Sequence, residues 1–345
     1  MRIILVGFGS VGQNFAKNIY QNFGNIFADF GFYPKLVAVV DRGGAAINPK
    51  GLNIERILSV KRKKQTVGLD PEFGVVDAKA SEVIENVDSE IVVEATPTNV
   101  IDGEPGLSHI EAALKRGKHV ITCNKGPLAL ALPALIELAE HNRVFLKFSG
   151  TVGGGTPILN FAKKCLKGSS IETVRGVLNG TTNYILTRME TGVPFEEALK
   201  EAQMKGYAEE DPSYDVCGID TACKLVILAN YVLGLEVTLK NVQINGITKV
   251  TYEQIEEANK RGRAVRLIGS ISKKKLKVSP EEIPRLHPLC VQGILNAVTF
   301  ETNECGEQTI IGRGAGGLET SIAILRDLIN IRDSLSKGFD FNGRG

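Results

Sequence analysis

The sequence predicts an α/β fold of two domains, in which a mostly parallel sheet with helices on both faces is followed by an α+β domain. Three observations support this prediction. The chain has 345 residues, more than one hydrophobic core comfortably serves. Apolar strands alternate with amphipathic helices over residues 1–150, as in a parallel sheet. After the turn GTVGGGTP, residues 150–157, the pattern changes to long helices and then to alternating strands.

The composition narrows the class of protein. Apolar residues make up 43% and charged residues 23% of the chain, which is typical of a folded globular protein. The formal net charge of +2 provides no electrostatic footprint for nucleic acid, and the basic run at residues 61–64 is typical of a solvated helix end or loop. The longest apolar runs fall short of the about 20 residues of a membrane span, and no signal peptide precedes the first strand. We therefore expect a cytoplasmic protein.

The cysteines and histidines do not predict a metal site or a disulfide framework. Four histidines lack metal-ligand spacing, and six cysteines are scattered without a C-x-x-C pair. We expect reduced thiols, most of them filling the core.

The first strand begins at Arg2 and leads directly into a glycine motif that opens a helix. The motif GFGSVG comprises Gly7, Phe8, Gly9, Ser10, Val11 and Gly12. Its first glycine suits a tight turn, its second a close approach to a pyrophosphate, and its third close helix packing. The amide groups of the helix N-terminus then face the phosphates. Because the motif stands directly after an N-terminal strand, it predicts a Rossmann-type dinucleotide-binding domain over residues 1–150 rather than a plain structural turn.

The second strand, Lys35 to Asp41, is predicted to end at the adenosine ribose. Asp41 would accept hydrogen bonds from a ribose diol and favour NAD. Arg42 could pair with a 2′-phosphate and favour NADP, or it could be an ordinary exposed arginine. The sequence leaves the choice between NAD and NADP open.

The remaining strands of this domain are predicted at residues 90–97, 119–126 and 143–150, with helices at 108–117 and 133–141. Ligands of such sheets bind beyond the carboxyl ends of the strands. Thr96 and Lys125 follow two of these strands. Lys125 could bind the cofactor or the substrate carbonyl, or it could be a surface lysine.

The second domain is predicted over residues 151–311 and a C-terminal segment over 312–345. A strand leads into a helix capped near Thr181, a buried helix runs from about Gly218 to Leu233, and antiparallel strands follow. The glycine-rich turn at residues 312–317 opens a helix to about Ile331, which we expect to return the chain to the first domain.

The segment GYAEEDPSYDVCGIDTACK, residues 206–224, combines five carboxylates with one lysine. Asp220 and Lys224 stand four residues apart and therefore share one face of the predicted helix. If this pair were exposed, it would contribute little to the stability of the fold. The apolar run that follows indicates a largely buried helix, where a pair without function would be costly. A dehydrogenase of an amino acid needs carboxylates for the ammonium group and a cationic donor for the reacting oxygen, and this segment supplies both.

Six segments of the chain resemble those of the homoserine dehydrogenase family, in the family's order. They are GFGSVG, TCNKGPLA, FSGTVGGGTPI, LNGTTNYILTRM, GYAEEDPSYDVCGIDTACKL and GRGAGGLETS. The resemblance is to the short form without kinase or regulatory domain. It implies the interconversion of L-aspartate 4-semialdehyde and L-homoserine with NADPH or NADH, on the route to threonine, methionine and isoleucine. It also implies a homodimer built on the second domain.

The resemblance assigns roles by matched position. Lys224 resembles the family's proton donor, Glu209 and Asp220 resemble its substrate-binding carboxylates, and Lys125 resembles a lysine between nicotinamide and substrate. Two glycines, Gly206 and Gly316, resemble cofactor contacts.

The family also holds a monovalent cation, usually sodium, on backbone carbonyls. The matched residues are Val152, Gly154 and Thr156. Many members carry an acidic residue where Ser149 stands, and this chain departs from them there.

Two alternative functions stay open from the residues alone. One is a dehydrogenase of another small amino acid or semialdehyde on the same fold. The other is a non-enzymatic NAD(P)-binding sensor, which needs the glycine motif but neither Lys224 nor Glu209.

Overall fold

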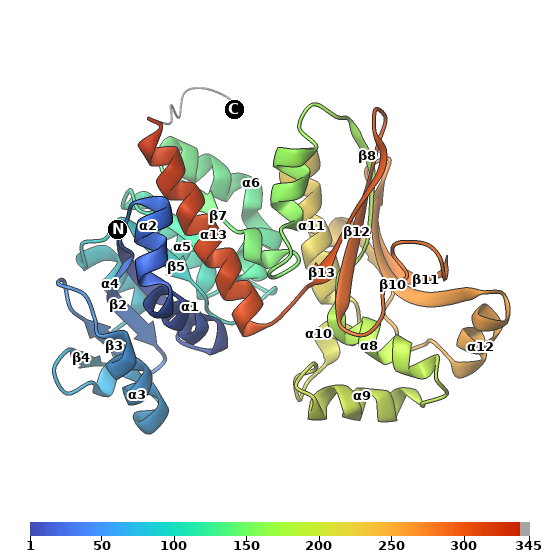
Figure 1. Cartoon of the computed structure of the whole chain (residues 1–345), viewed down its shortest axis with the longest axis horizontal. Coiled ribbons are helices and arrows are strands. Elements are labelled where there is room, and N and C mark those ends of the chain that lie inside the picture. Colours follow the sequence, from blue (N-terminus) through green and yellow to red (C-terminus); the bar gives the residue numbers. More distant parts are fainter. Residues whose placement is uncertain (339–345) are drawn as a thin grey trace. The chain divides into compact units, whose positions relative to one another are not determined.

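The computed structural model describes residues 1–338, and its chain divides into two units (Figure 1). Unit 1 contains Met1–Thr151 together with the C-terminal segment that starts at Gly316. Unit 2 contains Val152–Ala315. The two ends of the described chain therefore belong to one unit, and the middle of the chain forms the other.

Unit 1 is built on a seven-stranded sheet with the order β4-β3-β2-β1-β5-β6-β7. Five strands are parallel neighbours: β1 (Arg2–Val6), β2 (Lys35–Asp41), β5 (Ile91–Glu94), β6 (His119–Thr122) and β7 (Leu146–Lys147). The predicted mostly parallel sheet is confirmed. Two short strands extend it antiparallel at one edge, β3 (Gly44–Ile47) and β4 (Gly74–Val76), and the sequence pattern did not indicate them.

Helices cover this sheet. They are α1 (Ser10–Gln21), α2 (Phe23–Phe30), α3 (Ile54–Lys64), α4 (Ala80–Asn86), α5 (Gly106–Lys115), α6 (Lys125–His141) and α13 (Gly317–Ser336). Helix α6 begins earlier than predicted because the Asn124 side chain caps it by accepting from the Gly126 amide, and the helix kinks at Ala131, two residues before Pro133.

The C-terminal helix α13 lies along α1 within unit 1 (Figure 1). Its buried residues Ile324, Leu328 and Ile331 join Phe15 and Ile19 of α1 in one apolar core. Asn18 donates to the Ser321 hydroxyl at 2.6 Å, which satisfies a buried amide inside this contact. The last helix thus completes the core that the first strand and helix begin.

Unit 2 contains a six-stranded sheet with the order β13-β12-β8-β10-β11-β9. Its strands are β8 (Ile171–Val177), β9 (Val242–Ile244), β10 (Arg263–Ser272), β11 (Lys275–Pro284), β12 (Leu295–Thr302) and β13 (Gly306–Arg313). All neighbours pair antiparallel except β9 and β11, which are parallel. This is the α+β domain that the sequence predicted.

The helices of unit 2 are α7 (Ile158–Asn160), α8 (Gly180–Met189), α9 (Phe195–Met204), α10 (Ser213–Val216), α11 (Ile219–Leu233) and α12 (Tyr252–Lys260). Helix α11 is buried continuously from Asp220 to Ala229, because its apolar residues surround the helix rather than forming one stripe. The predicted buried helix is therefore confirmed.

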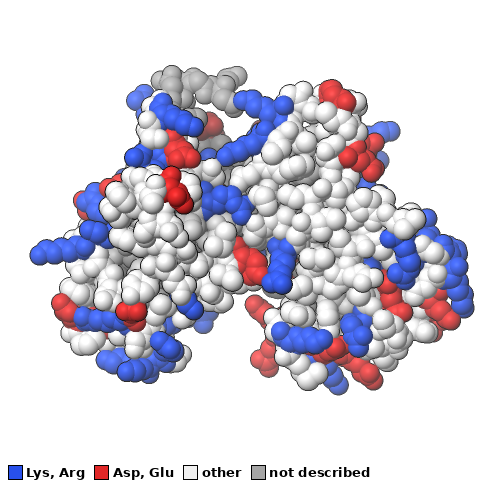
Figure 2. Space-filling view, in the orientation of Figure 1, with Lys and Arg blue, Asp and Glu red and all other residues white. Residues whose placement is uncertain are grey.

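Three features of the described chain bear on the earlier expectations. None of the helices in residues 1–338 combines the length and the apolar character needed to cross a lipid bilayer. On the face drawn in Figure 2, basic and acidic side chains are interspersed, in keeping with the small net charge.

The expectation that most thiols fill the core is wrong. Of the six cysteines, Cys223 alone is fully buried, whereas Cys165, Cys217 and Cys305 are exposed.

Candidate active site

The glycine motif forms a tight turn between β1 and α1. Gly7 has a φ of +96°, and a Cβ there would lie 2.4 Å from the Ala95 carbonyl oxygen. A Cβ at Gly12 would lie 2.2 Å from the Gly7 carbonyl oxygen. Gly9 faces open space instead, with no heavy atom within 4 Å of the position of a Cβ. The turn is thus closed by strand β5 on one side and open at Gly9, as a cradle for a pyrophosphate requires.

The N-terminus of α13 reaches the same turn within unit 1. A Cβ at Gly317 would lie 2.2 Å from the Ser10 hydroxyl oxygen, and the neighbouring Gly316 is exposed with a φ of +134°. Gly316 therefore lies beside the glycine motif, although more than 300 residues separate them in the sequence. This position suits the cofactor contact predicted for Gly316, which stays a prediction.

Asp41 lies at the end of β2, where the ribose-binding residue was expected, but its carboxylate is already engaged. It accepts hydrogen bonds from the Gly43 and Val67 amides, the Thr66 hydroxyl and the Lys61 ammonium, which lies 2.8 Å away. Burial opposes ionisation, yet these hydrogen bonds hold the pKa of Asp41 below its ordinary value. Lys61 lies in the last turn of helix α3 and pairs with Asp41, so it is not simply solvated as predicted. Arg42 is exposed.

Thr96 and Lys125 follow the neighbouring strands β5 and β6, and Asn124 connects the two strand ends. The Asn124 amide donates to the Thr96 hydroxyl at 3.2 Å and to the Pro97 carbonyl at 3.3 Å. Its oxygen accepts from the Gly126 amide at 3.1 Å. The position of Lys125, the first residue of α6, is thereby tied to the position of Thr96.

Ser149 directly precedes the turn at residues 150–157 that was matched to a cation site. The Ser149 amide donates to the Asp327 carboxylate at 2.8 Å, so the acidic group facing this residue comes from α13. Residues Val152, Gly154 and Thr156 follow in unit 2, and the Thr156 carbonyl accepts from the Ile158 amide. Backbone carbonyl oxygens are suitable ligands for a hard cation. Among residues 1–338, His, Cys, Asp and Glu side chains form no group of three that could hold a metal ion.

The buried carboxyl of Asp327 should make the stability of this protein depend on pH. Burial raises its pKa from 3.8 to about 6. The folded state therefore binds a proton more tightly than the unfolded state, and the free energy of unfolding should fall as pH rises from 4 to 6. The expected loss is about 3 kcal/mol. The variant D327N keeps an oxygen for the Ser149 amide, so chemical denaturation at pH 4 and pH 7 should show a smaller loss for the variant than for the parent. Equal losses would contradict the assignment.

In unit 2, Lys224 and Asp220 form a buried ion pair on the first turns of α11. The Lys224 nitrogen lies 2.7 Å from the Asp220 carboxylate, and the side chains are only 6% and 9% exposed. Lys224 also donates to the Leu178 carbonyl at 2.6 Å. The prediction of one helix face and a buried environment for this pair is confirmed. An ammonium held by two acceptors at fixed positions retains a third proton to donate.

Asn179 brings a second carboxylate to this pair. Its side-chain nitrogen donates to Asp220 at 2.9 Å and to Asp215 at 2.6 Å, and its oxygen accepts from the Thr182 amide. Burial and the nearby Asp220 charge raise the pKa of Asp215. Asn179, not Thr181, is the residue that caps α8. Reasoning from the sequence missed this role, although an Asn directly before a helical pattern is a signal for it.

Glu209 and Gly206 lie in the loop between α9 and α10. The Glu209 backbone carbonyl accepts from the Gln203 amide at 3.1 Å, while its side chain is exposed. Gly206 is exposed as well and has a φ of +71°, the left-handed conformation common after a helix. The loop is joined to α8 by the Thr181 hydroxyl, which donates to the Tyr207 carbonyl at 2.7 Å.

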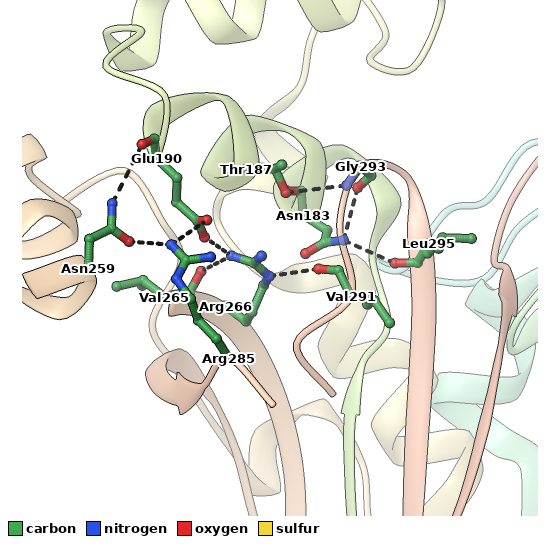
Figure 3. Close-up of polar contacts among 10 residues, drawn as sticks. All are labelled: Asn183, Thr187, Glu190, Asn259, Val265, Arg266, Arg285, Val291, Gly293 and Leu295. Atoms are coloured by element: carbon green, nitrogen blue, oxygen red, sulfur yellow. Dashed lines mark hydrogen bonds and ion pairs between the residues drawn. The ribbon is translucent and has the colours of Figure 1, made fainter. Parts of the chain in front are cut away.

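A buried polar network holds the other end of α8 (Figure 3). The Glu190 carboxylate pairs with Arg266, which is fully buried, and with Arg285. Arg266 also donates to the Val291 carbonyl at 2.8 Å. Asn183 donates to the carbonyls of Gly293 and Leu295 from the middle of the helix. These bonds fix α8 against residues 291–295, and α8 in turn carries Asn179 at its N-terminus.

Comparison with known proteins relates both units to one family. The family model described as "Homoserine dehydrogenase, NAD binding domain" matches residues 7–148, and the model "Homoserine dehydrogenase" matches residues 157–329. Over 98% of this chain and 100% of the relative, the sequence is 46% identical to homoserine dehydrogenase from Methanocaldococcus jannaschii. The chain belongs to the homoserine dehydrogenase family. It is therefore an NAD(P)-dependent oxidoreductase by family.

Two further members of the family are described with different cofactors. An NAD(+)-dependent homoserine dehydrogenase from Pseudomonas canavaninivorans is 39% identical, with 97% of each chain covered. A hyperthermophilic archaeal homoserine dehydrogenase solved in complex with NADPH has a TM-score of 0.84 and 29% identity, with 98% of each chain covered. The expected resemblance to this family and the two-domain α/β fold are confirmed.

Proposed function

We propose that this member of the family interconverts L-aspartate 4-semialdehyde and L-homoserine with NADPH or NADH. The observation that carries the proposal is the buried Lys224–Asp220 pair, because its ammonium group is held by two acceptors and keeps one proton for a substrate oxygen. When bound, the dinucleotide supplies or accepts the hydride at C4 of the substrate.

Lys224 is the proposed proton donor. In the reducing direction, negative charge grows on the aldehyde oxygen, and a fixed ammonium stabilises that charge and gives up its proton. The Leu178 carbonyl and Asp220 hold the lysine nitrogen in place, so little reorganisation accompanies the transfer. In the oxidising direction, the neutral amine takes the proton back.

Carboxylates of the same segment are proposed to bind the substrate amino and hydroxyl groups. Glu209 presents an exposed carboxylate on the loop after α9, and Asp220 lies beside Lys224. We extend this proposal to Asp215, which Asn179 holds next to Asp220. Lys125, at the start of α6, is proposed to lie between the nicotinamide and the substrate. Gly206 and Thr96 are proposed as cofactor contacts.

A single assay tests reaction and cofactor choice together. The purified protein should oxidise NADPH or NADH when aspartate 4-semialdehyde is added, as followed by absorbance of the reduced nicotinamide. Lys61 partly neutralises Asp41, and Arg42 is exposed beside it, so both cofactors should be compared in parallel. A protein that binds either cofactor but shows no turnover with semialdehyde or homoserine would rule the proposal out.

Sodium is part of the proposal, held by the backbone carbonyls of Val152, Gly154 and Thr156. Position 149 is a serine here, and without a carboxylate from that position the cation should be held weakly. We therefore expect turnover to rise when sodium is added to a protein dialysed free of it, and to saturate only at millimolar or higher concentration. Identical rates in sodium-free and sodium-containing buffer would count against a functional cation.

A homodimer, a cytoplasmic location and a role in threonine, methionine and isoleucine synthesis complete the proposal. Strand β13 forms one edge of the unit 2 sheet and has no buried residue, and an edge strand of this kind can pair with a second copy. Light scattering of the purified protein gives its molar mass in solution and so tests the dimer. The pathway role is tested in a strain that lacks homoserine dehydrogenase and expresses this protein instead. That strain should grow without added threonine and methionine.

A further inference from the structure

Glu94 is a buried carboxylate that the mechanism above does not use. It is the last residue of β5 and is fully buried. In the sheet it lies between Val6 of β1 and Thr122 of β6. From β1 the chain continues to β2 on one side of the sheet, and from β5 it continues to β6 on the other side. The strand order therefore reverses between β1 and β5, where Glu94 lies. Dinucleotides bind across the crevice at this switch point.

Donors from Thr96, Thr122 and Asn124 point at the Glu94 carboxylate. Its Oε1 atom accepts from the Thr96 amide at 3.0 Å and from the Thr96 hydroxyl, and its Oε2 atom accepts from the Thr122 hydroxyl at 2.9 Å. All of these donors are neutral groups, so they satisfy the oxygens of Glu94 without cancelling its charge.

The two hydroxyl groups are oriented by Asn124. The Thr122 hydroxyl oxygen accepts from the Asn124 amide at 3.0 Å, and the Thr96 hydroxyl oxygen accepts from the Asn124 side chain at 3.2 Å. Each hydroxyl therefore directs its own proton toward Glu94. A carboxyl group that accepts hydrogen bonds on both oxygens suits the ionised form, which is a pure acceptor.

Two opposing effects act on the ionisation of Glu94, burial and hydrogen bonding. Burial is the largest effect and raises the pKa of Glu94 above its ordinary value, although hydrogen bonds from Thr96, Thr122 and Asn124 lower it. A charge in a region of low dielectric acts over a longer distance than one in water. Residue 95 follows at the closed side of the glycine turn, since its carbonyl oxygen is the atom that excludes a side chain from Gly7.

We propose that Glu94 is a positioning residue for the dinucleotide, and that its negative charge favours the oxidised cofactor, whose nicotinamide ring is a cation, over the neutral reduced cofactor. Through Thr96, Thr122 and Asn124 it also holds the ends of β5 and β6 at the spacing that places Lys125. The inference rests on dinucleotide binding by this family and is independent of the identity of the substrate.

The test compares the binding of NADP⁺ and NADPH by the parent and by E94Q at one pH. NADPH is titrated by its fluorescence and NADP⁺ by calorimetry, and NAD⁺ with NADH serves as a second pair. Removing the charge with little change of shape should raise the Kd of the oxidised cofactor about tenfold and the Kd of the reduced cofactor much less. Because this readout needs no substrate, it stands even if homoserine is not turned over.

Two further variants separate charge from structure. E94D keeps the charge and should keep the ratio of the two Kd values close to that of the parent. T122V removes one donor and should shift the ratio in the same direction as E94Q, by less, which preserves a test if E94Q does not fold. Equal weakening of both cofactors in E94Q would reduce Glu94 to a structural residue. The proposal would also be overturned if E94Q changed neither Kd. The same holds if E94D changed the ratio of the two Kd values as much as E94Q does.

Discussion

Replacing Lys224 with alanine is expected to lower kcat by about 10²–10⁴-fold, the usual contribution of a positioned general acid. The nitrogen of Lys224 is the only part of the Lys224–Asp220 pair that can donate a proton to the aldehyde oxygen. Cofactor binding should persist, because the glycine motif lies in unit 1 and Lys224 lies in unit 2. The measurement is turnover of aspartate 4-semialdehyde, with NADPH binding followed separately by fluorescence.

A matched pair on α12 provides the control for Lys224. Lys260 pairs with Glu256 at the same spacing of four residues, but the two side chains are 68% and 47% exposed. K260A should leave turnover unchanged, since an exposed pair of this kind contributes little. If K224A keeps turnover within tenfold of an active parent, Lys224 is not the proton donor. If the parent binds cofactor but has no turnover, the sensor alternative gains support.

Replacing Arg266 with methionine is expected to lower the free energy of unfolding by about 3–5 kcal/mol, because it removes one partner from a buried ion pair. Glu190 would stay buried with Arg285 alone, and the Val291 carbonyl would lose its donor (Figure 3). Methionine fills most of the volume of the arginine stem, so the loss reports mainly the polar network. Urea denaturation of the two proteins measures the difference.

The control for Arg266 is Arg261, which pairs with Glu282 at the surface. The side chains of that pair are 57% and 35% exposed. R261M should change the free energy of unfolding by less than about 1 kcal/mol. If R266M also lowered the free energy of unfolding by less than about 1 kcal/mol, the buried network would contribute little to stability. Because this network anchors α8, R266M should also weaken substrate binding through Asn179, visible as a raised KM.

The fold could be predicted well where local patterns are strong. Continuous apolar runs such as residues 36–40 predicted parallel strands, and the apolar segment after Lys224 predicted a buried helix. The antiparallel strands β3 and β4 were missed, since they are only four and three residues long and carry no alternation. The start of α6 at Lys125 was missed because the apolar residues around it also suit a strand.

The candidate site could be predicted in part. Spacing alone placed Asp220 and Lys224 on one face, because a helix repeats every 3.6 residues. The sequence did not indicate that Asn179, 41 residues before Asp220, would join Asp215 to this pair. It also suggested a carboxylate of Glu209 close to the substrate, whereas the structure shows an exposed side chain on a loop tied by its backbone. The role of Glu209 stays a prediction.

The sequence by itself determined the features that depend on near neighbours in the chain. These are the glycine turn after β1, the alternation of strands and helices, and the Lys224–Asp220 pair, all set by backbone geometry over a few residues. Only the tertiary structure decided which distant side chains meet: Glu94 between β1 and β6, Asp327 on the Ser149 amide, and Asp41 on Lys61. Those contacts arise from strand order and helix packing, which residue spacing does not record.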